Sequence, residues 1–166
     1  MEVFTVSIFG HRRLYDSIWI EEQLEELVLE LLRTKQYVEF LVGRDGDFDI
    51  IAASVIRRCK REYRNDNSSL VLVLPYMRAD IRDNEESYRE YFDEIEVFSG
   101  TYYKSAFQQR NRDMVSRSHL AIFAVNKTEG GAYSTMKYAT AKGVSIINLY
   151  EALEKRACGE NTLCLE

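Results

Sequence analysis

The sequence predicts an α/β protein: a single Rossmann-like, doubly wound, mostly parallel sheet with helices on both faces. Short apolar, β-branched runs alternate along the 166-residue chain with segments whose apolar residues recur at helical spacing. The third run, Ser69 to Leu74, is almost purely apolar, as in a parallel strand covered on both faces. This order implies right-handed crossovers, so we expect ligands at the carboxyl ends of the strands.

Each expected element has its own signal in the sequence. Pro75 is expected to end the third strand because proline lacks a backbone N–H, and Gly143 is expected to cap the last helix. The polar segment 76–89 is expected to be a loop with a short helix. The expected helices span 18–34, 51–63, 105–117 and 132–142. The expected strands are Val3–Phe9, Glu39–Val42, Ser69–Leu74, Ile95–Phe98, His119–Val125 and Ser145–Leu149.

Composition sets limits on the class of protein. A chain that is 46% hydrophobic at this length forms one core, so we expect one domain over 1–150 and a tail or short helix over 151–166. The net charge of −5 argues against nucleic acid as a partner, although a local basic site stays open. Without a signal peptide or a membrane-length apolar run, a cytoplasmic location is expected. Cys59, Cys158 and Cys164 form no CxxC pair and are assigned no chemistry.

A glycine pair precedes the last helix. Gly130 and Gly131 let backbone amides approach a ligand closely, and the helix that follows directs unpaired N–H groups and a positive dipole end outward. This arrangement suits a phosphate group. Ser134 and Thr135 either add hydroxyl donors or cap the helix.

Polar residues also interrupt the helix before the fifth strand. Asn111 lies on a face that otherwise reads apolar, where it either ties loops together or contacts a ligand. Arg110 and Arg112 flank it, and only one of them needs to face the pocket to bind a phosphate or carboxylate.

Polar loops follow the first two strands. His11 and Arg12 emerge at the edge of the expected pocket, but no Cys or His is spaced as a co-ligand, so no metal site is predicted. Asp45, Asp47 and Asp49 resemble a calcium loop but lack its downstream glutamate, so one of them is expected to cap the helix. Another could accept hydrogen bonds from ribose hydroxyls.

Together these motifs resemble the bacterial SLOG superfamily, which comprises Rossmann-like nucleotide-binding domains related to DprA and LOG proteins. Its DUF1273 or YpsA-like branch is the most similar. The resemblance rests on FGHR after the first strand, on RNRDMVSRSHLAIFAV, on the GG pair, and on a T-x-x-x-A-x-x-x-G helix at Thr135, Ala139 and Gly143. It implies a ligand with ribose and phosphate, bound by Gly10, His11, Arg12, Gly43, Asp49, Arg110, Asn111, Arg112, Gly130, Gly131, Ser134 and Thr135.

The chain also departs from this family. LOG phosphoribohydrolases carry a PGGxGTxxE-like motif with a catalytic acid, whereas here Glu129 replaces the proline and Lys137 stands in place of the glutamate. No catalytic residue is therefore assigned. In the second loop, Asp45 and Asp47 replace small residues, which leaves open a different ligand or a need for a cation.

Three functional hypotheses follow. The first is a domain that binds or senses a nucleotide or an ADP-ribose-like derivative without catalysis. Beyond this nucleotide-like ligand, no cofactor is assigned. The second is an N-glycosidic-bond hydrolase in which another acid replaces the lost glutamate. The third is DprA-like binding of single-stranded DNA, which the acidic pI of about 5.2 disfavours. The resemblance also implies a homo-oligomer. Several tyrosines, including Tyr76, Tyr88, Tyr91 and Tyr102, could stack on a base or form an oligomer contact.

Overall fold

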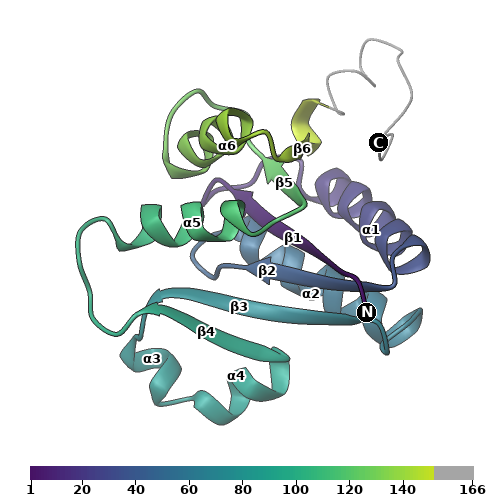
Figure 1. Cartoon of the computed structure of the whole chain (residues 1–166), viewed down its shortest axis with the longest axis horizontal. Coiled ribbons are helices and arrows are strands. Elements are labelled where there is room, and N and C mark those ends of the chain that lie inside the picture. The colour runs from purple at the N-terminus through teal and green to yellow at the C-terminus, as the bar shows by residue number, and fades with distance from the viewer. Residues whose placement is uncertain (152–166) are drawn as a thin grey trace.

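The computed structural model describes residues 1–151, whose strands alternate with helices along the chain (Figure 1). The predicted tail and both of its cysteines, Cys158 and Cys164, lie outside the described residues. The strands are β1 (Val3–Gly10), β2 (Tyr37–Val42), β3 (Ser68–Tyr76), β4 (Glu94–Ser99), β5 (Leu120–Ala124) and β6 (Ser145–Asn148). The helices are α1 (Ser17–Thr34), α2 (Asp47–Glu62), α3 (Ala79–Arg82), α4 (Glu85–Tyr91), α5 (Ala106–Ser116) and α6 (Gly131–Lys142).

All six strands form one parallel sheet in the order β4-β3-β2-β1-β5-β6, which confirms the predicted fold class. The chain builds outward from β1 to β4 and then returns to place β5 on the other side of β1 (Figure 1). The order reverses between β1 and β5, and in open α/β sheets this is where ligands bind, beyond the carboxyl ends of the strands.

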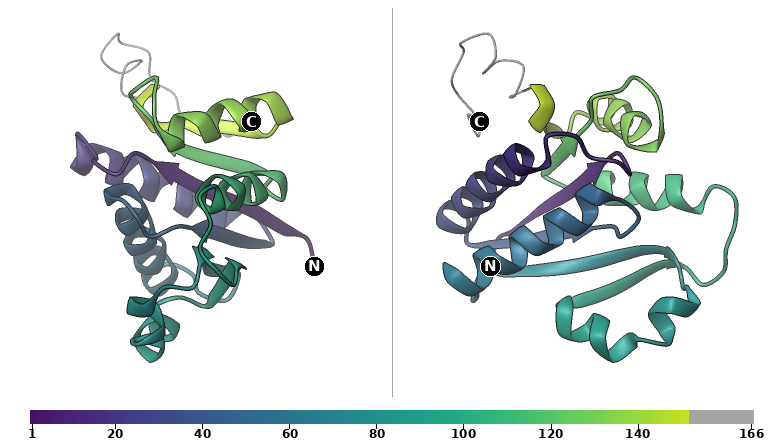
Figure 2. Two further views of the ribbon diagram at one scale, coloured as in Figure 1. Left: turned by 90° about the vertical axis from the view of Figure 1, so that its left-hand side faces the viewer. Right: turned by 180° about the vertical axis from the view of Figure 1, so that it is seen from behind.

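Helices cover both faces of the sheet. Figure 2 shows α1 and α2 together on one face, and α5 and α6 pack on the other. Successive side chains of a strand point to opposite faces, so Ile8 joins the core under α1 and α2 while Phe9 joins the core under α5 and α6. No helix within residues 1–151 has both the length and the apolar character needed to cross a membrane.

Two expectations about the middle of the chain need correction. Strand β3 does not stop before Pro75 but continues through it to Tyr76. Pairing with β2 ends at Leu72, so no β2 carbonyl group faces the missing N–H of Pro75. The segment 76–89 contains the short α3 and most of α4 rather than one short helix in a loop.

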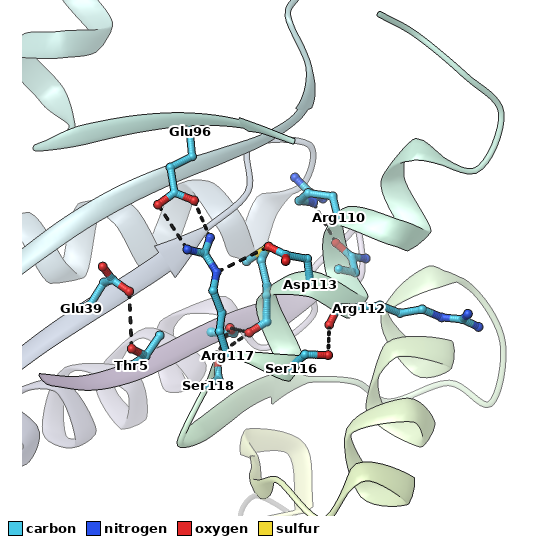
Figure 3. Close-up of polar contacts among 12 residues, drawn as sticks. Thr5, Glu39, Glu96, Arg110, Arg112, Asp113, Ser116, Arg117 and Ser118 are labelled. Carbon is cyan, nitrogen blue, oxygen red and sulfur yellow. Dashed lines mark hydrogen bonds and ion pairs between the residues drawn. The ribbon is translucent and has the colours of Figure 1, made fainter. Parts of the chain in front are cut away.

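At the carboxyl end of α5, charged side chains contact the edge strand β4. Arg117, the residue after α5, pairs with Glu96 of β4 and with Asp113 (Figure 3). These three side chains form a surface ion-pair network between α5 and the edge strand. Networks of this kind contribute little stability unless the charges are well ordered.

Candidate functional site

A cavity of about 240 Å³ lies at the carboxyl end of the sheet, beside the switch point. Loops after β1 and β2 form one wall, and α5 with the start of α6 forms the other. The lining includes seven of the residues expected to bind the ligand: Gly10, Arg12, Gly43, Asp49, Arg110, Asn111 and Gly131. The fold thus brings together residues that are far apart in the sequence.

The β1 loop is packed directly against the start of α2. A Cβ atom on Gly10 would lie 2.6 Å from Cβ of Phe48, so only glycine fits there. The carbonyl oxygen of Arg12 accepts a hydrogen bond from the Asp47 amide at 2.9 Å, and the Asp47 carboxylate accepts one from the Leu14 amide at 3.0 Å. The backbone of Arg12 is therefore fixed while its side chain stays exposed at the cavity.

His11 belongs to this loop but does not line the cavity. Its Nε2 atom is buried without a hydrogen-bond partner among residues 1–151, and its Nδ1 atom faces Gly130. Burial, and then the positive charge of Lys127, lower the pKa of His11, although Glu129 opposes this shift. His11 is therefore neutral near pH 7 and packs against the Gly130 turn.

Arg110 is the buried cation of the cavity, with 6% of its surface exposed. Its Nη1 donates to the carbonyl oxygen of Val73 at 2.7 Å, and its Nε donates to Oδ1 of Asn111 at 2.9 Å. Within the described residues Nη2 has no hydrogen-bond acceptor. Burial lowers the pKa of Arg110, while Asp49 and Asp45 favour its charged form. A fixed guanidinium with one group free can bind an anion without reorganising.

Asp49 faces Arg110 across Gly43. A Cβ atom on Gly43 would lie 2.9 Å from Oδ2 of Asp49 and 3.2 Å from Nη1 of Arg110, so the absence of a side chain at Gly43 makes room for both charged groups. The amide of Asp45 donates to Oδ2 of Asp49 at 3.0 Å. Burial raises the pKa of Asp49 to about 6, even though Arg110 and this amide favour the carboxylate.

The predicted helix cap is not provided by an aspartate side chain. Gly46 occupies the N-cap position of α2, and no side chain there accepts a capping hydrogen bond. Asp47 instead binds the β1 loop, and Asp49 binds the amide of Asp45 in the preceding loop. These carboxylates hold the two loops that form the cavity.

Asn111 joins α5 to α6. Its Nδ2 donates to Oγ1 of Thr135 at 3.2 Å, and Oγ1 of Thr135 donates to the carbonyl oxygen of Gly131 at 2.8 Å. Thr135 is buried, with 5% of its surface exposed. Of the two roles open for Asn111, the structure shows the one that ties elements together, and it places the amide at the cavity wall as well.

The first turn of α6 borders the cavity, and its first backbone N–H groups have no intrahelical partner. Gly130 is the N-cap with φ of 92°, a conformation that favours glycine. The first intrahelical bond to Gly130 comes from the Ser134 amide, so the amides of residues 131–133 precede the hydrogen-bonded ladder. Gly131 and Ala132 line the cavity, and no atom would crowd a Cβ at Gly131.

Other predicted residues lie away from this cavity. Arg112 is exposed and its guanidinium carbon lies 5.1 Å from the ring centre of Tyr138; Figure 3 shows Arg110 and Arg112 leaving α5 in different directions. Ser134 is exposed and does not line the cavity. Lys137, at the position of the LOG glutamate, is exposed, and its Nζ lies 5.3 Å from the ring centre of Tyr133.

A row of three aromatic rings, Phe107, Tyr76 and Tyr102, leads out of the cavity. Phe107 lines the cavity, and its ring centre lies 5.9 Å from that of Tyr76. Tyr76 in turn lies 5.2 Å from Tyr102, which is 67% exposed. The sequence shows both tyrosines as candidates for stacking but does not show that the three rings meet, because they come from β3, the β4–α5 loop and α5.

Two residues that were not predicted from the sequence hold backbone segments next to the cavity. The buried side chain of Asn148 accepts from the amide of Val125 at 3.1 Å and donates to its carbonyl oxygen at 2.9 Å, which fixes the end of β5. The hydroxyl group of Tyr150 accepts from the amide of Tyr15 at 3.0 Å and donates to its carbonyl oxygen. A polar residue that ends an otherwise apolar strand, as Asn148 does, is the signal that could have found the first of them.

Ion pairs close the side of the cavity that faces β3. Arg78 pairs with Asp45 at 2.5 Å and with Asp80 at 3.3 Å, and Asp80 also pairs with Arg44 at 2.5 Å. Asp45 and Asp47, which stand where the related family has small residues, therefore differ in role. Asp45 is neutralised by an arginine of this chain, and Asp47 bonds to a backbone amide.

Comparisons with known proteins agree on the fold. No family model matches the sequence, and no curated protein does. DNA processing protein A from Streptococcus pneumoniae matches in structure with a TM-score of 0.62 at 15% identity, covering 86% of this chain and 49% of that one. DNA processing protein A from Helicobacter pylori, whose structure concerns its binding mode for single-stranded DNA, matches at 0.62 and 17% identity, covering 92% and 72%. This chain thus spans about half the length of the pneumococcal protein.

These matches confirm the Rossmann-like fold that the resemblance implied, which this chain shares with both DNA processing proteins, while the DUF1273 or YpsA-like branch stays a prediction. They contradict the expectation that nucleic acid is not a partner, since both proteins process DNA and one is described by how it binds single strands. That expectation used net charge, which sums over the whole chain. Many of the acids lie on two helices outside the cavity, as Glu21, Glu22, Glu25, Glu26 and Glu30 on α1 and Glu85, Glu86 and Glu90 on α4.

Proposed function

We propose that this chain binds single-stranded nucleic acid along the carboxyl edge of its sheet, with one backbone phosphate in the cavity between the β1 loop and α6. The row of Phe107, Tyr76 and Tyr102 carries the proposal, because it joins a cavity bordered by anion-binding groups to an exposed aromatic surface. Proteins that bind single strands combine a positively charged groove with aromatic rings on which bases stack. The single-stranded DNA binding of the Helicobacter pylori neighbour supports the same choice.

The phosphate would meet three kinds of donor in the cavity. The first is the start of α6, whose first amides have no intrahelical partner and whose positive dipole end favours an anion. Nη2 of Arg110 is fixed and lacks an acceptor within the described residues. The exposed guanidinium of Arg12 can close over the phosphate from the solvent side.

Neighbouring phosphates would lie over the rim. Arg13 in the β1 loop and Lys127 in the β5–α6 loop are both exposed, and neither forms an ion pair within the described residues. Each cation that neutralises a phosphate adds to the salt dependence of binding, since counterions are released. Affinity is therefore expected to fall steeply as salt rises, in spite of the acidic pI.

A free nucleotide or an ADP-ribose-like derivative is the second candidate. It is favoured by the small volume of the cavity, about 240 Å³, and by Asp49, whose carboxylate is placed to accept a hydrogen bond from a sugar hydroxyl. Binding of this kind would depend on Arg110 and Gly131 but would not need the exposed ring of Tyr102. The aromatic row thus separates the two candidates.

A matched pair of tyrosine variants tests the proposal. Tyr102→Ala removes the outer ring of the row, while Tyr63→Ala removes a ring that is 52% exposed at the far end of α2. With a labelled oligothymidylate, fluorescence anisotropy should show a loss of about 1–3 kcal/mol of binding free energy for Tyr102→Ala. Tyr63→Ala should bind as the wild type does.

Two results would contradict the proposed binding of single strands. Equal affinities for both variants would contradict a role of the aromatic row. Wild-type protein that fails to bind the oligonucleotide at low salt, yet is stabilised against heat by AMP or ADP-ribose, would favour the free-nucleotide candidate.

A further inference from the structure

A second cavity, of about 530 Å³, lies next to the first, between α2 and the α3–α4 segment. Its apolar wall is made by Ile50 and Ala53 of α2 and by the rings of Tyr88, Tyr91 and Phe92. Ile50 is 62% exposed, so this wall continues to the surface and the cavity is accessible from solvent. Volume and lining match those of pockets that bind small planar molecules.

Three aromatic rings lie side by side in the lining. The rings of Tyr88 and Phe92 are nearly parallel, with centroids 6.4 Å apart and planes inclined by 8°, and the ring of Tyr91 lies 4.9 Å from Phe92 at an inclination of 59°. The guanidinium of Arg44 lies 4.8 Å from the ring centre of Tyr88, which adds a cation at the mouth. A fused heteroaromatic ring would cover more of this wall than a single ring would.

Two polar groups of the same α3–α4 segment also line the cavity. Nδ2 of Asn84 donates to the carbonyl oxygen of Asp80 at 2.7 Å, which orients its Oδ1 as an acceptor for other donors. The hydroxyl group of Ser87 is exposed on the same lining. An exocyclic amino group and a ring nitrogen of a base could pair with these two groups.

The two cavities share a wall. Gly43 and Asp49 line both of them, and the ion pairs of Asp45, Arg78, Asp80 and Arg44 run from the rim of the first to the rim of the second. Gly43 has no side chain, and the Asp49 carboxylate and the Arg110 guanidinium occupy the space beside it. A nucleotide whose sugar lies at Asp49 could therefore place its phosphate in one cavity and its base in the other.

We infer that the second cavity is a nucleobase site that binds a purine. This inference rests on the proposed binding of single strands and adds that one base leaves the strand to insert between α2 and α4. The sugar of that nucleotide lies at Asp49 and its phosphate lies at Arg110. The site adds base preference to a surface that otherwise contacts phosphates and stacks on bases without discrimination.

The test uses two variants on adjacent positions of α4. Ser87→Phe places a ring in the cavity, while Glu86→Phe places the same ring on a residue that does not line it. Both positions are exposed, so neither change disturbs the core. The probes are two short oligothymidylates, one with a central adenine and one with an abasic site at the same position.

Wild type and Glu86→Phe should bind the adenine oligonucleotide about tenfold more tightly than the abasic one. Ser87→Phe should lose this preference and keep the affinity for the abasic strand. Two variants with the same preference, or wild-type protein without any preference, would overturn the base site and leave strand binding intact. Wild-type protein that binds neither strand would overturn the proposed function and the base site with it.

Discussion

Replacing Asp49 by asparagine should make the protein less sensitive to pH. Asparagine keeps an oxygen that can accept from the Asp45 amide, as Oδ2 of Asp49 does at 3.0 Å, but it cannot ionise. Burial raises the pKa of Asp49 from 3.8 to about 6, so the folded state disfavours the carboxylate. The variant removes this cost, and it also removes the attraction between Asp49 and Arg110.

The sign and size of the effect follow from proton linkage. An acid with a raised pKa binds a proton on folding between pH 3.8 and pH 6, so its contribution to the free energy of unfolding decreases as pH rises through this range. At about 1.4 kcal/mol per pH unit, the difference between the two pKa values amounts to about 3 kcal/mol. Between about pH 4 and pH 7, the free energy of unfolding of Asp49→Asn should therefore rise by about 3 kcal/mol relative to that of the wild type.

Urea unfolding of both proteins, followed by circular dichroism at several pH values, measures this difference. Other carboxylates contribute equally to the two curves and cancel when one is subtracted from the other. A difference that stays constant from acid to neutral pH would refute the reasoning, because it would mean that Asp49 is as well solvated in the folded state as in the unfolded one.

Two further predictions concern stability. Gly43→Ala should lower the free energy of unfolding by about 1–3 kcal/mol in urea, because its Cβ would lie 2.9 Å from Oδ2 of Asp49; unchanged stability would show that this wall can relax. Asn148→Ala should cost about 1–3 kcal/mol in the same assay, since it leaves both backbone groups of Val125 without their partner. The exposed Asn84→Ala is the control and should change stability little; equal losses for the two asparagines would contradict this role of Asn148.

The sequence predicted the fold well where burial is uniform. Strands β1, β3 and β5 are buried along most of their length, so their apolar runs stand out without further context. Strand β4 lies at the edge of the sheet and has no fully buried residue, so its pattern is weak. The short α3 and α4 are too brief to show a helical period, which explains why the segment between β3 and β4 was predicted poorly.

The site was predicted at the level of loops but not of side-chain direction. Arg110 and Arg112 are two positions apart on a helix and point to different sides, and the residue types alone do not say which one is buried. The spacing did hold a clue, because Arg110 lies four residues from both Ala106 and Met114, which are buried. The aromatic row and the second cavity depend on the packing of separate elements, which no local pattern encodes.

The contact between Tyr150 and Tyr15 has a consequence for synthesis of the chain. The two residues are 135 positions apart, and the bond anchors the loop that carries Arg12. During translation, β1 and its loop leave the ribosome long before Tyr150 does, at about 5–20 residues per second. The loop therefore lacks this anchor until β6 and Tyr150 have emerged, and the nascent chain should fix this wall of the candidate cavity only after that point.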